Sequence, residues 1–281
     1  TAGGALFAAF PAAYATTFSG FYLAVMLVLF GLIVRAVSVE YRGYGPAWGK
    51  AWDACFTVGS LLPALLLGVA VGNIYAGIPM DANGDYAGIP LLGLVTPFTL
   101  LCGLLGLSMF LAQGASWLAL KAPKPSEVQT RAAGLRLPLQ VVSLVLFAVV
   151  SVYALAGIQA PMDPALGVVR WLLAALFVVA VVASVFFAKK KDCDLGAFIA
   201  QSASCAVLVL LLAASMFPNF VMASADSVGP AITAMSAASS DLTLMWMTII
   251  TCVGLPLVLA YHVIIYRTFR GRVKDEDLAH Y

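Results

Sequence analysis

The sequence predicts an all-α integral membrane protein, a polytopic helix bundle with seven full spans and one partial span. Of its 281 residues, 63% are hydrophobic and only 10% are charged, and its mean hydropathy is +1.01. Ordinary soluble domains carry about 25% charged residues. Several uncharged stretches reach the length of about 20 residues that a helix needs to cross the hydrocarbon core. Lys and Arg residues also gather in alternate connections between these stretches.

Seven stretches without Asp, Glu, Lys or Arg define the expected spans. They are residues 17–34, 54–71, 91–120, 137–158, 171–188, 195–217 and 242–266. Residues 1–14 are apolar but too short to cross a membrane alone. The chain opens on Thr1 without the layout of a signal peptide. We therefore expect residues 1–14 to be the tail of a longer helix, and residues 1–281 to form a single transmembrane domain that is incomplete at its N-terminus.

The basic residues predict the orientation of the spans, because cytoplasmic loops retain Lys and Arg. If alternate loops share a side, only Arg170 of the fifteen basic residues lies on the second side. The first side holds Arg35, Arg42, Lys50, Lys121, Lys124, Arg131, Arg136, Lys189, Lys190, Lys191, Arg267, Arg270, Arg272 and Lys274. This side, which includes the C-terminal tail, is predicted to be cytoplasmic. The net charge of +2 thus reports topology and implies no nucleic-acid partner.

Two connections on the opposite side are long. Residues 72–90 (GNIYAGIPMDANGDYAGIP) carry Gly, Pro and Asn-Gly turn signals. Residues 218–241 form the second and are rich in Ala and Ser. Within them, residues 219–235 (NFVMASADSVGPAITAM) have the pattern of a helix that lies along the membrane surface, but a surface-packed loop is the favoured interpretation.

The residues that usually bind metals are sparse. One histidine, His262, lies in an expected span, and an intramembrane histidine more often bonds a neighbouring helix than ligates iron. The segment Asp192-Cys193-Asp194 follows three lysines and is interpreted as a solvated loop. The other histidine is His280, and the cysteines, interpreted as small core residues, are Cys55, Cys102, Cys193, Cys205 and Cys252. No carboxylate lies inside a span, which disfavours an ion-coupled transporter without excluding one.

The stretch VTPFTLLCGLLGLSMFLAQGASWL, residues 95–118, carries polar groups that lipid cannot satisfy. Ser108, Ala112 and Ser116 recur every four residues, a spacing that lets another helix approach closely. Gln113 lies beside this face. We expect its amide to bond across the helix contact; the alternative is that it holds a proton-conducting water or a quinone headgroup.

The stretch RAVSVEYRGYGPAWGKAWDAC, residues 35–55, is the most charged part of the first half. It contains Arg35, Glu40, Arg42, Trp52 and Asp53. Interfacial aromatics and snorkelling cations explain part of this composition. The alternation of acids and arginines also predicts an ion-pair network that fixes the hairpin or contacts a partner subunit.

Several strings resemble, in order along the chain, subunit II of the bd-type quinol oxidases of bacteria and archaea. They are TAGGALFAAFPAAYATTFSGFYLA, VEYR, PALLLGVAVGN followed by GIP, TPFTLLCG leading to AQGASWL, MFPNFVMAS, and SSDLTLMWMTII running to RGRVKDEDL. The resemblance covers nearly the whole chain and implies a fold of two four-helix bundles plus a peripheral helix, nine helices in all. The short loops are similar to those of the cyanide-insensitive branch.

In this family, subunit I carries two haems b, one haem d and the quinol site. The resemblance therefore implies a subunit that ligates no haem or metal and has no catalytic residue, in the bacterial or archaeal cytoplasmic membrane. Its expected partners are subunit I, a small single-helix accessory subunit, membrane lipids and quinone. The resemblance does not decide whether this chain also binds a structural quinone. The complex would oxidise quinol, reduce dioxygen to water and generate a proton gradient.

The positions that match the family are structural or interface candidates. They are Arg35, Glu40, Arg42, Trp52, Asp53, Asn73 and Gln113. Two alternatives remain: a transporter or permease whose ion site lies upstream of Thr1, and an assembly factor that associates only transiently.

Overall fold

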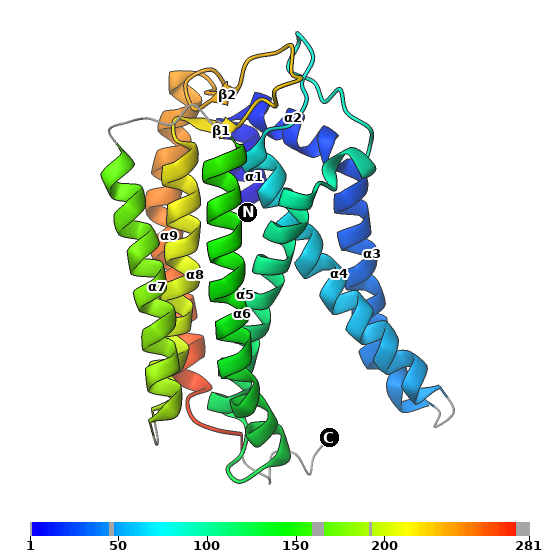
Figure 1. The fold of residues 1–281 in the computed structure, drawn as a ribbon, viewed down its shortest axis with the longest axis vertical. Coiled ribbons are helices and arrows are strands. Elements are labelled where there is room, and N and C mark those ends of the chain that lie inside the picture. The colour runs from blue at the N-terminus through cyan, green and yellow to red at the C-terminus, as the bar shows by residue number, and fades with distance from the viewer. Residues whose placement is uncertain (1, 45–47, 159–165, 191–192, 274–281) are drawn as a thin grey trace.

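The computed structural model describes residues 2–44, 48–158, 166–190 and 193–273. Within these residues, seven helices are long and apolar enough to cross a membrane, which confirms the expected number of full spans (Figure 1). They are α3 (Tyr22–Tyr41), α4 (Gly49–Ala76), α5 (Pro97–Lys121), α6 (Glu127–Gly157), α7 (Gly167–Lys189), α8 (Asp194–Met216) and α9 (Asp241–Thr268).

Several helix ends differ from the expected spans because local capping, not charge, sets them. Helix α3 continues past residue 34 to Tyr41, so Arg35 and Glu40 are helical. Helix α5 begins at Pro97 instead of residue 91, because Thr96 and Thr99 form a capping box. Helix α6 starts ten residues before the expected 137, with Ser126 accepting a hydrogen bond from the Gln129 amide as its N-cap.

The N-terminal segment is two helices, so residues 1–14 do not form one uninterrupted helix; that α1 is the tail of a longer helix stays a prediction. Helix α1 (Ala2–Ala9) ends at Phe10, and α2 (Pro11–Gly20) begins with proline at its first position. Proline has no N–H to continue the preceding helix and disfavours helical geometry in the residue before it. Helix α2 consequently turns and runs across the end of the molecule (Figure 1).

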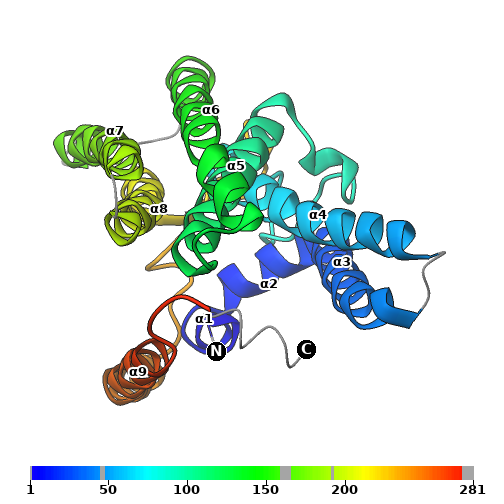
Figure 2. The same cartoon turned by 90° about the horizontal axis from the view of Figure 1, so that it is seen from below.

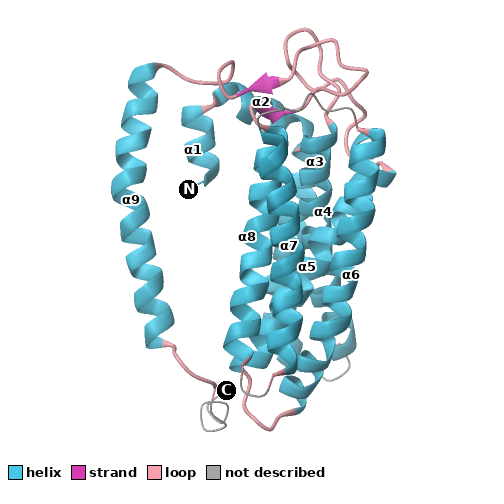
Figure 3. Cartoon of the chain, turned by 60° about the vertical axis from the view of Figure 1, so that its left-hand side comes forward, coloured by secondary structure: helices cyan, strands magenta, loops and turns pink. Residues whose placement is uncertain are grey.

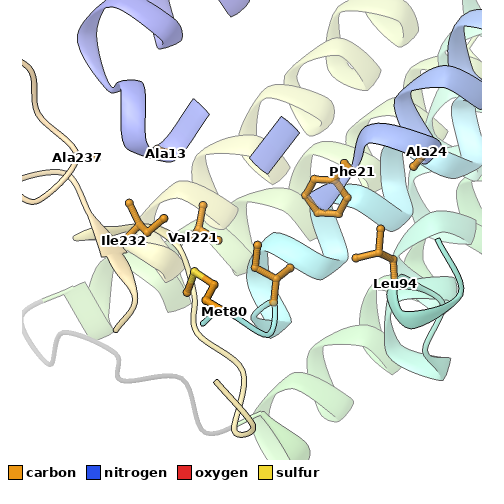
Figure 4. Close-up of a cluster of buried hydrophobic side chains, with 9 residues drawn as sticks. Ala13, Phe21, Ala24, Met80, Leu94, Val221, Ile232 and Ala237 are labelled. Atoms are coloured by element: carbon orange, nitrogen blue, oxygen red, sulfur yellow. The ribbon is translucent and has the colours of Figure 1, made fainter. Parts of the chain in front are cut away.

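The long connections on this end pack together. Strand β1 (Asn219–Val221) pairs antiparallel with β2 (Ile232–Thr233), which confirms a surface-packed loop and not a surface helix in residues 219–235. Beneath this pair lies an apolar cluster that joins α2, α3 and both connections (Figure 4). Its buried members are Ala13, Phe21, Ala24, Ile78, Met80, Leu94, Val221, Ile232 and Ala237.

The spans fall into three groups (Figures 2 and 3). Helices α5, α6, α7 and α8 form a four-helix bundle, and the α3–α4 hairpin attaches to it through α4 and α5. Helix α9 stands apart from the bundle beside α1 and has no buried residue. The α3–α4, α5–α6 and α7–α8 connections and the segment after α9 all lie at one end, here called the basic end (Figure 1).

Glycines set the distance between neighbouring helices. A methyl group added at Gly68 on α4 would lie 2.8 Å from the Cα of Gly103 on α5. In the hairpin, a methyl group at Gly59 on α4 would lie 2.6 Å from the carbonyl oxygen of Gly31 on α3. These helices therefore touch backbone to backbone, as small residues allow in membranes.

Candidate functional site

The predicted site residues do not form one site. Five lie at the basic end of the α3–α4 hairpin, Asn73 lies near the opposite end of α4, and Gln113 faces the four-helix bundle from α5.

At the hairpin tip, one ion pair forms. Arg42 donates from Nε to Asp53 Oδ1 at 2.5 Å and from Nη2 to Oδ2 at 3.2 Å. This hydrogen-bonded carboxylate raises the pKa of the Arg42 guanidinium. Both side chains remain largely exposed, at 65% and 51%. The pair links the end of α3 to the first turns of α4.

The other hairpin candidates act separately, so a wider ion-pair network is not observed among the described residues. Arg35 lies over the ring of Phe56, with 5.8 Å from its Cζ to the ring centroid. Trp52 packs against Tyr41 with ring centroids 5.7 Å apart. Glu40 is exposed and forms no ion pair with a described residue. Apolar and cation–π contacts therefore complement the single charge pair.

Asn73 is buried and joins three elements. Its Nδ2 donates to the carbonyl oxygens of Val69, one turn earlier in α4, and Leu94, at 2.8 and 2.7 Å. Leu94 belongs to a short 3-10 turn before α5, and its carbonyl also accepts from Thr99 Oγ1 at 2.9 Å. Asn73 thus fixes the end of α4 to the start of α5.

Gln113 bonds across a helix contact, as its sequence position predicts. Its Nε2 donates to Ser202 Oγ on α8 at 2.7 Å. The small-residue face beside it is buried, and Ser108 Oγ lies 2.9 Å from Ser143 Oγ on α6. Helix α5 therefore contacts α6 and α8 through short polar side chains.

The sequence interpretation missed an ionic cluster around Asp194. Its carboxylate accepts from Arg136 at 2.9 Å and Arg272 at 2.7 Å, and lies 3.0 Å from Lys124 Nζ. The Asp194 side chain is 16% exposed and that of Arg136 only 2%. The interpretation of Asp194 as part of a solvated loop is therefore wrong, while Asp192 lies outside the described residues.

This cluster also holds the segment after α9. Arg272 Nη1 donates to the carbonyl oxygens of Ala119 and Ala122, and Lys121 Nζ donates to those of Phe269 and Gly271. The Val273 amide donates to the Lys121 carbonyl at 2.9 Å. The chain after the detached helix α9 is in this way fastened to the bundle.

A signal for the cluster was present in α6. Arg136, Gln140, Ser143 and Phe147 recur at helical spacing, and all four are buried. A stripe of this periodicity marks the inner face of a helix. The expected span began at residue 137, which placed Arg136 in a loop and hid the pattern.

The His, Cys, Asp and Glu side chains of the described residues do not gather into a metal-binding group. No group of three or more His, Cys, Asp or Glu side chains among them could hold an ion. His262 is exposed on α9, and its Nδ1 lies 2.8 Å from the Val258 carbonyl, within its own helix. The five cysteines are free. Cys205 packs against the apolar core of the four-helix bundle and Cys102 lies in the α4–α5 contact beside Gly72, whereas Cys252 is exposed, so the interpretation as a core residue is wrong for Cys252.

Comparison with known proteins agrees with this architecture. The family model described as cytochrome bd terminal oxidase subunit II matches residues 1–269. The chain is 34% identical to cytochrome bd-I ubiquinol oxidase subunit 2 of Escherichia coli strain K12, over 99% of this chain and 81% of that protein. It is 33% identical to cytochrome bd ubiquinol oxidase subunit 2 of Bacillus subtilis, over 99% of this chain and 80% of the relative.

The fold has a solved counterpart. A chain of the bd oxidase structure from Geobacillus thermodenitrificans superimposes with a TM-score of 0.66 and 16% sequence identity, covering 88% of this chain and 72% of that one. The seven membrane spans and the family match along residues 1–269 lead to the same assignment. This chain belongs to the cytochrome bd terminal oxidase subunit II family.

Proposed function

We propose that this chain is the haem-free membrane subunit that assembles with a haem-bearing subunit I into a quinol:dioxygen oxidoreductase. The complex oxidises quinol and reduces dioxygen to water, and takes up protons from the cytoplasm. The observation that carries the proposal is the 34% identity to a ubiquinol oxidase subunit 2 across 99% of the chain.

The scarcity of histidine in the described part of this chain supports placing the two haems b and the haem d in subunit I. Haem iron takes a proximal His in globins and peroxidases, and a His together with a Met in cytochromes c. The single histidine in the described part of the chain lies on the outward surface of α9. In the proposal, this chain shields the haem subunit and supplies an apolar route along which dioxygen diffuses.

The α3–α4 hairpin is the proposed docking element. It projects to one side of the bundle (Figure 2), and Arg35, Glu40, Arg42 and Asp53 at its basic end are exposed. Exposed charges at an interface rim orient partners and select the correct one. Asn73 and Gln113 are proposed to act within this chain, because their amides bond its own helices.

A structural quinone in this chain is part of the proposal. A shallow, open apolar hollow lies along the outer half of α6, lined by Ala148, Val149, Val152, Tyr153, Ala156 and Gly157. Its lining suits an isoprenoid tail, and the Tyr153 hydroxyl supplies a donor for a quinone carbonyl. A small single-helix subunit is the remaining proposed partner.

Purification in mild detergent followed by a reduced-minus-oxidised visible spectrum tests the proposal. We expect a histidine-rich partner to co-purify, with b-type haem bands and the red-shifted band of haem d. A colourless chain that purifies alone would contradict the proposal and favour a transporter. Transient association would favour an assembly factor. Organic extraction of the same sample tests for the quinone, with Tyr153→Phe expected to lower its occupancy.

A further inference from the structure

The orientation of the Gln140 amide is fixed inside the four-helix bundle. Gln140 Nε2 lies 2.6 Å from Ser184 Oγ, and Ser184 uses its single hydroxyl proton to donate to the Ala197 carbonyl at 3.0 Å. In this arrangement the serine oxygen accepts from the Gln140 amino group, which also lies 3.4 Å from Gln201 Oε1. The Gln140 carbonyl oxygen therefore points elsewhere, and it has no hydrogen-bond partner among the described residues.

Two further buried polar atoms nearby also lack a described partner. They are Nε of Arg136, one helical turn from Gln140 on the same face of α6, and Oγ of Ser116 on α5. Arg136 Nη2 reaches the Ser116 carbonyl at 3.4 Å, which places the two residues in contact. Arg136 is 2% exposed and both Ser116 and Gln140 are 0% exposed.

Three buried polar atoms without a described hydrogen-bond partner are unusual. Buried polar groups are nearly always hydrogen-bonded, because an unmet hydrogen bond leaves the cost of desolvating the group uncompensated. An ordered internal water meets this need when it finds two to four polar partners. Here Arg136 Nε offers a donor, Gln140 Oε1 offers an acceptor, and the Ser116 hydroxyl offers either, which are the groups that ordered water can satisfy.

We propose that Ser116, Arg136 and Gln140 form a binding site for ordered water within the α5–α8 bundle. The site lies toward the basic end, next to the ion pair between Arg136 and Asp194 at 2.9 Å. In the other direction it is closed by an apolar cluster around Phe147 and Phe177, whose ring centroids are 4.3 Å apart.

The site depends only on this chain's own helices, so it stands or falls separately from the proposed oxidase function. The test is a cryo-electron microscopy map of the chain in whatever assembly it purifies in, at a resolution that shows ordered waters. We expect a density peak within hydrogen-bonding distance of Gln140 Oε1, Arg136 Nε and Ser116 Oγ. Absence of this peak, while other buried waters are visible, would overturn the proposal.

Two variants identify the ligands of the peak. Gln140→Met removes the acceptor and should abolish or displace the density; an unchanged peak would contradict the assignment. Ser204→Ala is the matched control, because this buried serine already donates to the Gln201 carbonyl within its own helix at 2.7 Å. It should leave the peak in place. If Gln140→Met fails to fold, Ser116→Ala replaces it and should weaken or shift the peak.

Discussion

Arg136 on α6 and Asp194 on α8 form an ion pair at 2.9 Å although they are 58 residues apart, and the arginine is 2% exposed. Arg136 is thus a buried cation whose charge is balanced by a single carboxylate shared with Lys124 and Arg272. Removing one member of a buried pair costs far more than an exposed pair contributes, because the remaining charge stays desolvated.

Asp194→Asn should therefore destabilise the chain by about 3–5 kcal/mol. The measurement is thermal unfolding of the purified assembly. Lys124→Gln is the matched control, because its side chain is 38% exposed and water can replace the contact. Equal decreases in thermal stability for the two variants would show that the destabilisation by Asp194→Asn does not come from the burial of Arg136. Asp194→Leu combined with Arg136→Met should recover much of the loss.

Arg42→Ala or Asp53→Ala should reduce the yield of assembled complex more than the turnover per haem. The pair is exposed, so its loss affects docking rather than the helix bundle. The measurement is haem content of the purified complex beside oxygen consumption. Glu127→Ala breaks the still more exposed pair with Arg131 in α6 and should leave the yield unchanged. Normal yield with lost turnover in the Asp53 variant would argue for a catalytic role.

Gln113→Leu should be tolerated. It removes the bond to Ser202, and hydrogen bonds between membrane helices average about 0.6 kcal/mol in double-mutant cycles. It also removes the Gln113 carbonyl oxygen, which has no partner among the described residues. Oxygen consumption and haem content are the readouts, with Ser202→Ala as the comparison. Lost oxygen consumption with intact haem would instead assign the amide a proton or quinone role.

Gly68→Val should push α4 away from α5 and lower the thermal midpoint of the assembly. A side chain there would meet the backbone of Gly103 at 2.8 Å. Gly114→Ala on α5 is the control, since nothing lies within 4 Å of the added methyl group. The control should be neutral or stabilising by up to about 1 kcal/mol, the helix-propensity difference between the residues. A Gly68 variant as stable as this control would contradict close packing at that position.

The sequence was sufficient for the features set by the membrane. The length of the uncharged stretches predicts the seven spans. The distribution of Lys and Arg predicts that the basic connections lie at one end of the molecule (Figure 1). The small-residue face of α5 and the helix-crossing bond of Gln113 also follow from local spacing.

The remaining features depend on contacts between distant residues. Nothing near Asp194 reveals that Arg136 and Arg272, 58 and 78 residues away, surround it. The break at Pro11 and the extension of α6 to Glu127 depend on backbone capping, which hydropathy does not register. The hairpin network was overestimated because Arg35 lies over an aromatic ring rather than beside an acid.

The bundle interior is polar toward the basic end, around Gln140, Ser184 and Gln201, and apolar around Phe147 and Phe177. A polar interior has the higher effective dielectric constant, and an apolar one behaves as an insulator. When a respiratory membrane is energised, the voltage across this bundle therefore falls mostly over its apolar half. The local electric field there exceeds the average across the bilayer, so a charge introduced beside Phe177 would experience more of the membrane potential than one beside Gln140.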